Sequence, residues 1–64
     1  MTIGENIKQL REKRSLSQRK LAIAISVSNT TINSIENDKT LPSVPLILKL
    51  SDFFGCTTDE ILKN

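Results

Sequence analysis

A run of short, uncharged, hydrogen-bonding side chains lies in the middle of the chain, in the segment SNTTINSIEN. On a helix of 3.6 residues per turn, Asn29, Thr30, Asn33, Ser34 and Asn37 fall on one continuous face, and the two isoleucines of the segment fall on the opposite one. Amides and hydroxyls donate and accept hydrogen bonds, but they do not titrate near neutral pH. The segment is therefore suited to recognition by hydrogen bonding rather than to acid–base chemistry.

The edges of DNA bases are a surface that fits these side chains. Asparagine can form paired hydrogen bonds with adenine, serine and threonine donate or accept, and a threonine methyl can contact the thymine methyl. The alternative is that this face is only the solvated side of a helix. However, Asn, Thr and Ser cost a helix roughly 0.5 kcal/mol per residue relative to Ala, and solvated faces usually carry better helix formers. That cost favours a function that requires these side chains.

The composition argues against catalytic and metal chemistry. The chain has no histidine and one cysteine, Cys56, so it can form neither an internal disulfide nor a His/Cys zinc site. It also lacks the glycines of a phosphate-binding loop. We therefore expect no enzyme activity, no metal and no cofactor, and nothing indicates a small-molecule ligand. Cys56 is expected to be a small buried apolar residue rather than a redox switch.

The charges are unevenly distributed along the chain. Residues 1–39 hold seven Lys/Arg against four Asp/Glu, whereas residues 40–64 hold two against three. This is either a chance asymmetry of a solvated surface or a phosphate-facing half followed by a half that does not contact nucleic acid. Among Lys13, Arg14, Arg19 and Lys20, the last two are the better candidates for phosphate, because they share the first turn of a predicted helix with Gln18.

The length and hydropathy of the chain indicate one small domain in the cytoplasm. A chain of 64 residues can form a single core that buries about 60% of the unfolded surface. No apolar run is long enough to span a membrane, and the N-terminus lacks the order of a signal peptide. We expect one domain over residues 1–64 and no membrane partner.

Hydrophobic periodicity predicts five helices and no strands. The first begins with a capping box formed by Thr2 and Glu5, and it carries Ile3, Ile7 and Leu10 as one apolar stripe. The fourth is expected to end at Gly55, and Ile61 and Leu62 of the fifth are expected to point inward. The second to fifth helices are each predicted to follow a polar cap. These caps are, in order, Ser17, Ser28, Ser43 and Thr57.

The pattern SQRKLAIAISVSNTTINSIENDKTLPS resembles the helix-turn-helix family of phage repressors and Cro proteins, the Xre-type regulators. Gln18 opens the second helix, Ala22 is the small residue where the second and third helices cross, and Ser-Ile-Glu-Asn ends the third, followed by Lys39 and Pro42. The expected core positions of this motif are Leu21, Ile25, Val27, Ile32 and Ile35. The resemblance extends over essentially the whole chain. It implies an all-α, five-helix, lambda-repressor-like DNA-binding domain, with the helix-turn-helix at about residues 18–37.

The resemblance also implies a function. The chain would be a sequence-specific transcriptional regulator of double-stranded DNA, with repression as the expected direction, associated with the nucleoid. It would read the major groove with the helix that starts at Asn29 and bind as a homodimer to a roughly palindromic site, with half-sites about one turn apart. The alternative is an antitoxin or protein-interaction module with the same fold.

Phe53 and Phe54 are adjacent in the sequence, so both cannot face the same core. Either one of them lies near a dimer surface, or the second packs under the last helix.

Individual roles follow from the same resemblance. The base-reading residues would be Asn29, Thr30, Asn33 and Ser34. Phosphate contacts would come from Gln18, Arg19, Ser28, Thr31, Asn37 and Lys39, supported by the free N–H groups at helix N-termini. Arg11 and Glu36 would form a structural ion pair.

The sequence departs from the family pattern at three places. Ser26 stands where the turn usually carries a glycine with positive φ, so either Ser26 adopts the left-handed conformation at a cost or the turn differs. Asp38 replaces the glycine that often follows the third helix, which puts an anion near the expected phosphate contact. The stretch Leu41–Ser43 carries no arginine, so no arginine contact in the minor groove is predicted.

Overall fold

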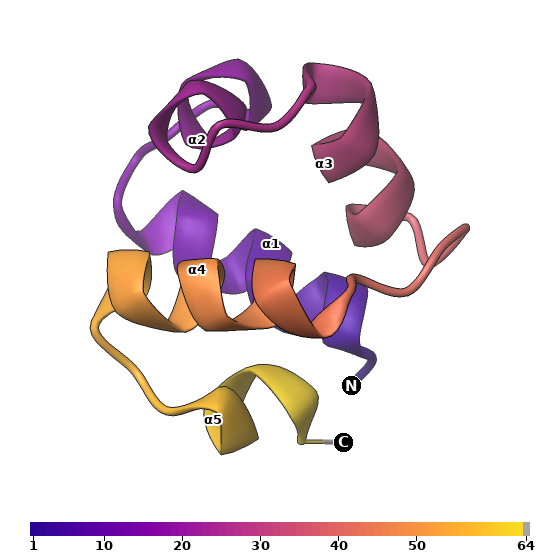
Figure 1. Ribbon diagram of the computed structural model, residues 1–64, viewed down its shortest axis with the longest axis vertical. Coiled ribbons are helices and arrows are strands. Elements are labelled where there is room, and N and C mark those ends of the chain that lie inside the picture. Colours follow the sequence, from indigo (N-terminus) through magenta and orange to yellow (C-terminus); the bar gives the residue numbers. More distant parts are fainter. Residues whose placement is uncertain (64) are drawn as a thin grey trace.

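The computed structural model describes residues 1–63, and it contains five helices and no strand within them (Figure 1). This confirms the prediction of an all-α, five-helix fold. The helices are α1 (Ile3–Lys13), α2 (Gln18–Ala24), α3 (Asn29–Glu36), α4 (Val44–Phe54) and α5 (Thr58–Leu62). None of the helices in this described part is long and apolar enough to cross a membrane.

The five helices pack around one shared core. In Figure 1, α2 and α3 lie at the top, α4 crosses in front of α1 in the middle, and α5 lies below. The packed pairs are α2 with α3, α1 with α3, α1 with α5, and α4 with α5. α1 therefore links the α2–α3 pair to the C-terminal helix.

All five predicted N-caps are confirmed, because the side chain of each cap accepts a hydrogen bond from the backbone of the first turn. At α1 the capping box is complete. Thr2 Oγ1 accepts from the Glu5 N–H at 3.1 Å, and Glu5 Oε1 accepts from the Thr2 N–H at 2.9 Å. The hydrogen bond from the Thr2 N–H, followed by the Thr2 side chain, lowers the pKa of the Glu5 carboxyl below its ordinary value. The helix starts are thus set by local side-chain chemistry.

Four helices end at a residue in the left-handed conformation. These residues are Ser15, Ser26, Asp38 and Gly55, with φ of 56°, 62°, 58° and 66°. In each case the N–H of the following residue donates to a carbonyl five positions earlier, which is the pattern of a Schellman motif. Of the two alternatives for Ser26, the structure shows the left-handed one. Three of the four motifs therefore carry a residue with a Cβ where glycine is the unstrained choice.

The replacement Ser26→Gly should stabilise the domain. Ser26 is exposed, and its side chain makes no hydrogen bond within the described residues, so the change relieves strain without removing a contact. We expect a gain of about 1 kcal/mol in the free energy of unfolding, or roughly 4–8 °C in Tm. The control is Ala24→Gly, at an exposed helical position, which should lose about 1 kcal/mol. Equal destabilisation of both variants in thermal unfolding would show that Ser26 is not strained.

The core is apolar and receives residues from all five helices or their caps. Its buried members are Ile7, Leu21, Ala22, Ile25, Ile32, Ile35, Leu46, Leu50, Phe54 and Ile61. The expectation that Ile61 and Leu62 both point inward is wrong for Leu62, which is 41% exposed while Ile61 is fully buried. Consecutive residues on a helix lie about 100° apart, and a helix as short as α5 presents only one narrow face to the core.

Two polar side chains, one on α1 and one at its C-terminal end, donate hydrogen bonds to the C-terminal half of the chain. Asn6 is buried, and its Nδ2 donates to the carbonyls of Ile61 at 2.9 Å and Lys63 at 2.7 Å. Arg14 donates to the carbonyls of Phe53 at 3.0 Å and Phe54 at 2.7 Å, which are the last residues of α4. These bonds satisfy carbonyls that a helix end leaves without a partner.

Arg14 also covers the aromatic pair that precedes Gly55. Its guanidinium lies 5.5 Å from the ring centre of Phe53 and 5.3 Å from that of Phe54, and the two rings meet edge to face with their centres 5.1 Å apart. Phe54 is buried and Phe53 is half-buried. From the sequence, Arg14 was expected to be either solvated or phosphate-facing, whereas in the structure its side chain holds the end of α4.

Candidate nucleic-acid interface

α2 and α3 form a compact pair joined by a short turn. Ile25 ends α2, Ser26 reverses the chain in the left-handed conformation, and Ser28 caps α3. Leu21 and Ile32, one from each helix, are fully buried. α3 is thus held by its inner face, and its outer face is left to solvent.

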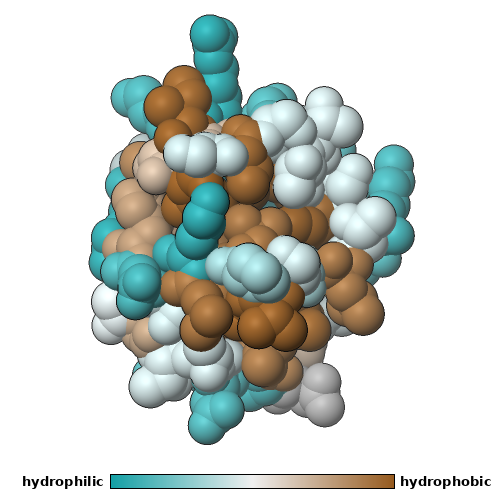
Figure 2. All heavy atoms as spheres, viewed as in Figure 1, coloured by the Kyte–Doolittle hydropathy of each residue, from teal (hydrophilic) through white to brown (hydrophobic). Residues whose placement is uncertain are grey.

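The outer face of α3 carries the uncharged polar side chains that the sequence placed there. Asn29, Thr30, Asn33 and Asn37 are exposed, and Ser34 is half-buried. The view in Figure 2 is pale to teal over α3, whereas brown apolar side chains gather around α4. The face therefore offers amide and hydroxyl groups.

The N-terminal end of α3 is organised by two hydroxyls. Ser28 Oγ accepts from the Thr31 N–H at 3.1 Å, and the hydroxyls of Ser28 and Thr31 share a hydrogen bond of 2.7 Å. The sequence assigned both residues to phosphate contacts, and the structure joins them to one another. The first-turn N–H groups of Asn29 and Thr30 have no partner within the helix, so the positive end of the helix dipole faces outward beside them.

A buried ion pair lies behind the exposed face. Arg11 Nε and Nη2 donate to Glu36 Oε2 and Oε1 at 2.7 and 3.0 Å, with 11% of the Arg11 side chain and 2% of the Glu36 side chain exposed. Arg11 Nη1 also donates to the Leu16 carbonyl at 2.6 Å. The hydrogen bond to Glu36 raises the pKa of Arg11 above its ordinary value. The pair thus connects α1, the turn before α2, and the end of α3.

Gln18 connects this ion pair to the exposed face. Its Nε2 donates to Glu36 Oε1 at 3.1 Å, and its Oε1 accepts from Asn33 Nδ2 at 3.3 Å. Asn37 in turn donates from Nδ2 to the Asn33 carbonyl at 2.9 Å. The side chain of Gln18, which the sequence assigned to phosphate, is half-buried and hydrogen-bonded to Glu36 and Asn33, so we expect its backbone N–H to be the group that meets an anion.

The cations around this face are few, and they lie at its edges. Arg19 and Lys20 on the first turn of α2 and Lys39 after α3 are exposed. Asp38 was expected to place an anion beside Lys39. Instead its carboxylate accepts from Thr2 Oγ1 at 2.8 Å and from the Gly4 N–H at 3.2 Å, so it is occupied by the start of α1.

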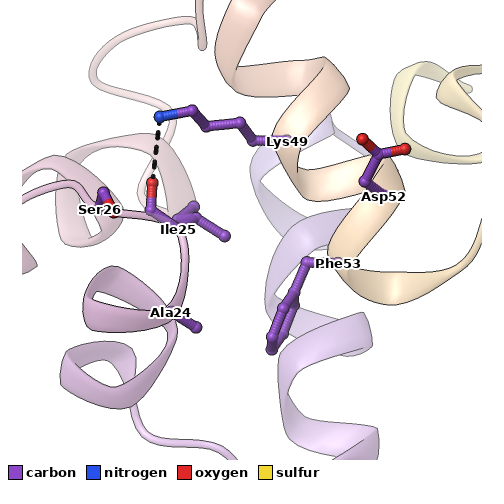
Figure 3. A pocket seen from close by; sticks show the side chains of 6 residues that line it. All are labelled: Ala24, Ile25, Ser26, Lys49, Asp52 and Phe53. Atoms are coloured by element: carbon purple, nitrogen blue, oxygen red, sulfur yellow. Dashed lines mark hydrogen bonds between the residues drawn. The ribbon is translucent and has the colours of Figure 1, made fainter.

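A shallow depression of about 380 Å³ lies between the end of α2 and α4 (Figure 3). Its lining residues are Ala24, Ile25, Ser26, Lys49, Asp52 and Phe53. Lys49 Nζ reaches the Ile25 carbonyl at 3.4 Å. The depression contains no residue of α3. In residues 1–63 no cluster of three or more metal-ligating side chains occurs.

Cys56 is half-buried just after the end of α4. Burial, followed by the charge of Glu60, raises the pKa of the Cys56 thiol above its ordinary value. A raised pKa disfavours the reactive thiolate, which agrees with the expected role of Cys56 as a small packing residue beside the core.

The α2–turn–α3 pair, its exposed polar helix and the three supporting helices define a helix-turn-helix domain. Residues 7–61 match the model of a family described as Helix-turn-helix. The chain belongs to this family, in its Xre-type branch, as the sequence resemblance implied.

Relatives of known name cover almost the whole chain. The HTH-type transcriptional activator BcrR of Enterococcus faecalis is 37% identical over 64 residues, which are 100% of this chain and 31% of that protein. Repressor protein C2 of Salmonella phage P22 is 34% identical over 62 residues, which are 97% of this chain and 29% of that protein. The chain spans about a third to a half of the length of the curated relatives BcrR, ImmR and PuuR, and about a tenth of PrpR and RamB.

Among solved structures, the P22 c2 repressor protein in complex with synthetic operator 9T, in the presence of Tl⁺, has the same fold. Its TM-score is 0.93 at 33% identity, over 98% of this chain and 96% of that one. The lambda-repressor-like architecture expected from the sequence is thereby confirmed.

Several contacts within the site were not predicted from the sequence, although the residues that make them were identified. The link from Asn33 through Gln18 to Glu36 joins residues 15 and 18 positions apart. The contact of Asp38 with the start of α1 spans 34 positions. Such contacts leave no periodic trace in a single sequence. The one available clue was that Gln18 and Asn33 are both amides, which pair readily.

Proposed function

We propose that the chain is a sequence-specific, double-stranded DNA-binding domain of a transcriptional regulator, with repression as its expected effect. The observation that carries the proposal is the exposed uncharged face of α3, because amides and hydroxyls on a protruding helix match base edges in a major groove. The P22 c2 repressor, which has this fold, was solved with an operator, and this supports the proposal. The role is non-enzymatic, and the DNA target places it in the cytoplasm at the nucleoid.

In this proposal the domain covers residues 1–64, and residues 18–37 dock on the DNA. The base readers are Asn29, Thr30, Asn33 and Ser34. The phosphate contacts are Gln18 through its backbone N–H, Arg19, Ser28, Thr31, Asn37 and Lys39. The outward dipole of α3 and the cations at the edges of the face support this arrangement.

A homodimer on a roughly palindromic site completes the proposal. One such domain has a small interface with DNA, and two half-sites about one turn apart raise both affinity and specificity. Val44 and Leu48 on α4 are 69% and 53% exposed, and Leu41 just before them is 79% exposed. Exposed apolar side chains in this region, visible around α4 in Figure 2, support self-association.

Selection of bound sequences from random DNA tests the function directly. We expect a preferred sequence with approximate two-fold symmetry. Asn29→Ala and Asn33→Ala should each lose roughly 1–3 kcal/mol of discrimination at one base position, while overall folding, measured by circular dichroism, is unchanged. Lys8→Met, on the exposed side of α1, is the control and should keep the full preference.

Salt dependence separates DNA binding from the alternative of a protein-interaction module. Two of the proposed phosphate contacts are cations, Arg19 and Lys39, which makes about four in a dimer, so affinity should fall on the order of a hundredfold between 50 and 200 mM salt, as measured by fluorescence anisotropy. Recovery of no preferred sequence at moderate salt, or an affinity that does not change with salt concentration, would contradict the proposed function.

A further inference from the structure

The buried carboxylate of Glu36 determines which way a nearby side-chain amide faces. Carboxylate oxygens only accept hydrogen bonds, and Glu36 Oε1 has Gln18 Nε2 at 3.1 Å. A reversed Gln18 amide would place its oxygen against this carboxylate. Since only 2% of the Glu36 side chain is exposed, solvent does not screen that repulsion. The NH₂ group of Gln18 is therefore held toward Glu36.

The orientation of Gln18 in turn determines that of Asn33. With its NH₂ toward Glu36, Gln18 presents Oε1 to the surface, where Asn33 Nδ2 lies at 3.3 Å. An oxygen accepts only, so Asn33 must offer its NH₂ group on that side. Its Oδ1 accepts no hydrogen bond within the described residues and belongs to an exposed side chain on the outer face of α3.

We infer that Gln18 and Glu36 act as positioning residues that fix the amide of Asn33 with its oxygen available to the DNA, so that Asn33 selects a base bearing an exocyclic amino group. This inference rests on the proposed function. An outward acceptor complements the amino groups of adenine and cytosine and repels the carbonyl oxygens of guanine and thymine. One N–H of Asn33 stays free, so its paired hydrogen bonds with adenine remain available, and adenine is the expected base.

The matched variants are Gln18→Met and Gln9→Met. The first keeps the size of the side chain but removes both amide contacts, and the second makes the same change at an exposed position of α1. The position read by Asn33 is identified as the one whose preference Asn33→Ala abolishes. There we expect the wild-type chain to prefer amino-bearing bases about ten- to a hundredfold. Gln18→Met should reduce this to within about threefold and leave the other positions unchanged, whereas Gln9→Met should match wild type.

An experiment on the unmodified chain avoids any folding defect of a variant. The selected base at that position is replaced by an analogue that lacks the exocyclic amino group, such as purine for adenine. Wild-type affinity should fall about tenfold or more, and an analogue that keeps the amino group should bind normally.

The amide spectrum of the free protein gives a readout that needs no DNA. In ¹H–¹⁵N spectra, the Asn33 side-chain proton that faces Gln18 should show slowed solvent exchange, which Gln18→Met removes and Gln9→Met keeps. A merely structural role of Gln18 would not produce a loss confined to one base position.

The outcomes separate this inference from the proposed function. Selective binding with guanine or thymine at the Asn33 position, or full preference retained by Gln18→Met, overturns the inference and leaves DNA binding intact. A uniform loss of affinity at all sequences in Gln18→Met, without a positional change, also overturns it, because that result would mean that the Gln18 side chain contributes to binding in general and not to the reading of one base. Failure to select any sequence refutes both.

Discussion

Glu36→Ala, with Arg11 left in place, should destabilise the domain by about 3–5 kcal/mol. The guanidinium would remain buried without the carboxylate that accepts two of its hydrogen bonds, and Gln18 would lose its acceptor as well. Domains of this size are stabilised by roughly 3–10 kcal/mol in total. Urea unfolding followed by circular dichroism should therefore give the variant a free energy of unfolding close to zero at 25 °C.

The double variant Arg11→Met/Glu36→Leu shows whether the cost comes from the orphaned charge. It removes both charges and refills their volume, so we expect it to be more stable than Glu36→Ala by about 2 kcal/mol. Recovery should be incomplete, since the Leu16 carbonyl also loses its donor. Lys8→Met, at an exposed position of the same helix, is the control and should change stability by less than about 0.5 kcal/mol. A loss below 1 kcal/mol in Glu36→Ala would show that the pair does not hold the fold.

The helix starts and the core were predictable from the sequence because both depend on local or periodic chemistry. Ser28, for example, caps α3 through a hydrogen bond to a residue three positions away. Ile32 and Ile35 bury themselves on the side that their spacing required. Information of this kind survives in any single sequence.

The helix ends were harder to predict. Gly55 was identified correctly, because glycine adopts positive φ without strain. Ser15 and Asp38 adopt the same conformation, although neither residue type requires it. At these positions the tertiary structure and the closing hydrogen bonds impose the turn, and local propensity does not report it.

Contacts between distant segments were the part the sequence did not disclose. Arg14 was one cation among several, and only the folded chain brings it to the last carbonyls of α4. Asn6 resembled any polar residue of an amphipathic helix, yet it is buried against the end of α5. For the candidate interface, the sequence predicted which residues are exposed. It did not predict which of them are hydrogen-bonded to one another, because that depends on the three-dimensional structure.

Gly4→Ala should be among the most damaging single substitutions, although it adds only one methyl group. Gly4 is buried where the start of α1 meets the end of α3. A Cβ built there would overlap the carbonyl oxygen of Ile35 and lie 2.9 Å from that of Glu36, and both are backbone atoms that cannot rotate away. It would also lie 2.6 Å from Asp38 Oδ1. We expect a loss of about 3 kcal/mol, because α1 and α3 must separate to admit the methyl group.

Two comparisons establish that the cause is close backbone contact. Gly55→Ala meets no atom within 4 Å and carries only the strain of φ +66°, so it should cost about 1 kcal/mol in the same thermal unfolding assay. Asp38→Ala removes the one flexible neighbour together with its hydrogen bonds to Thr2 and Gly4. Compared with Asp38→Ala alone, the double variant Gly4→Ala/Asp38→Ala should still be less stable by about 3 kcal/mol, because the two carbonyls remain. Since those carbonyls end α3, Gly4→Ala should also weaken DNA binding beyond its effect on the folded fraction. Wild-type stability of Gly4→Ala would mean that α1 does not position the recognition helix at this contact.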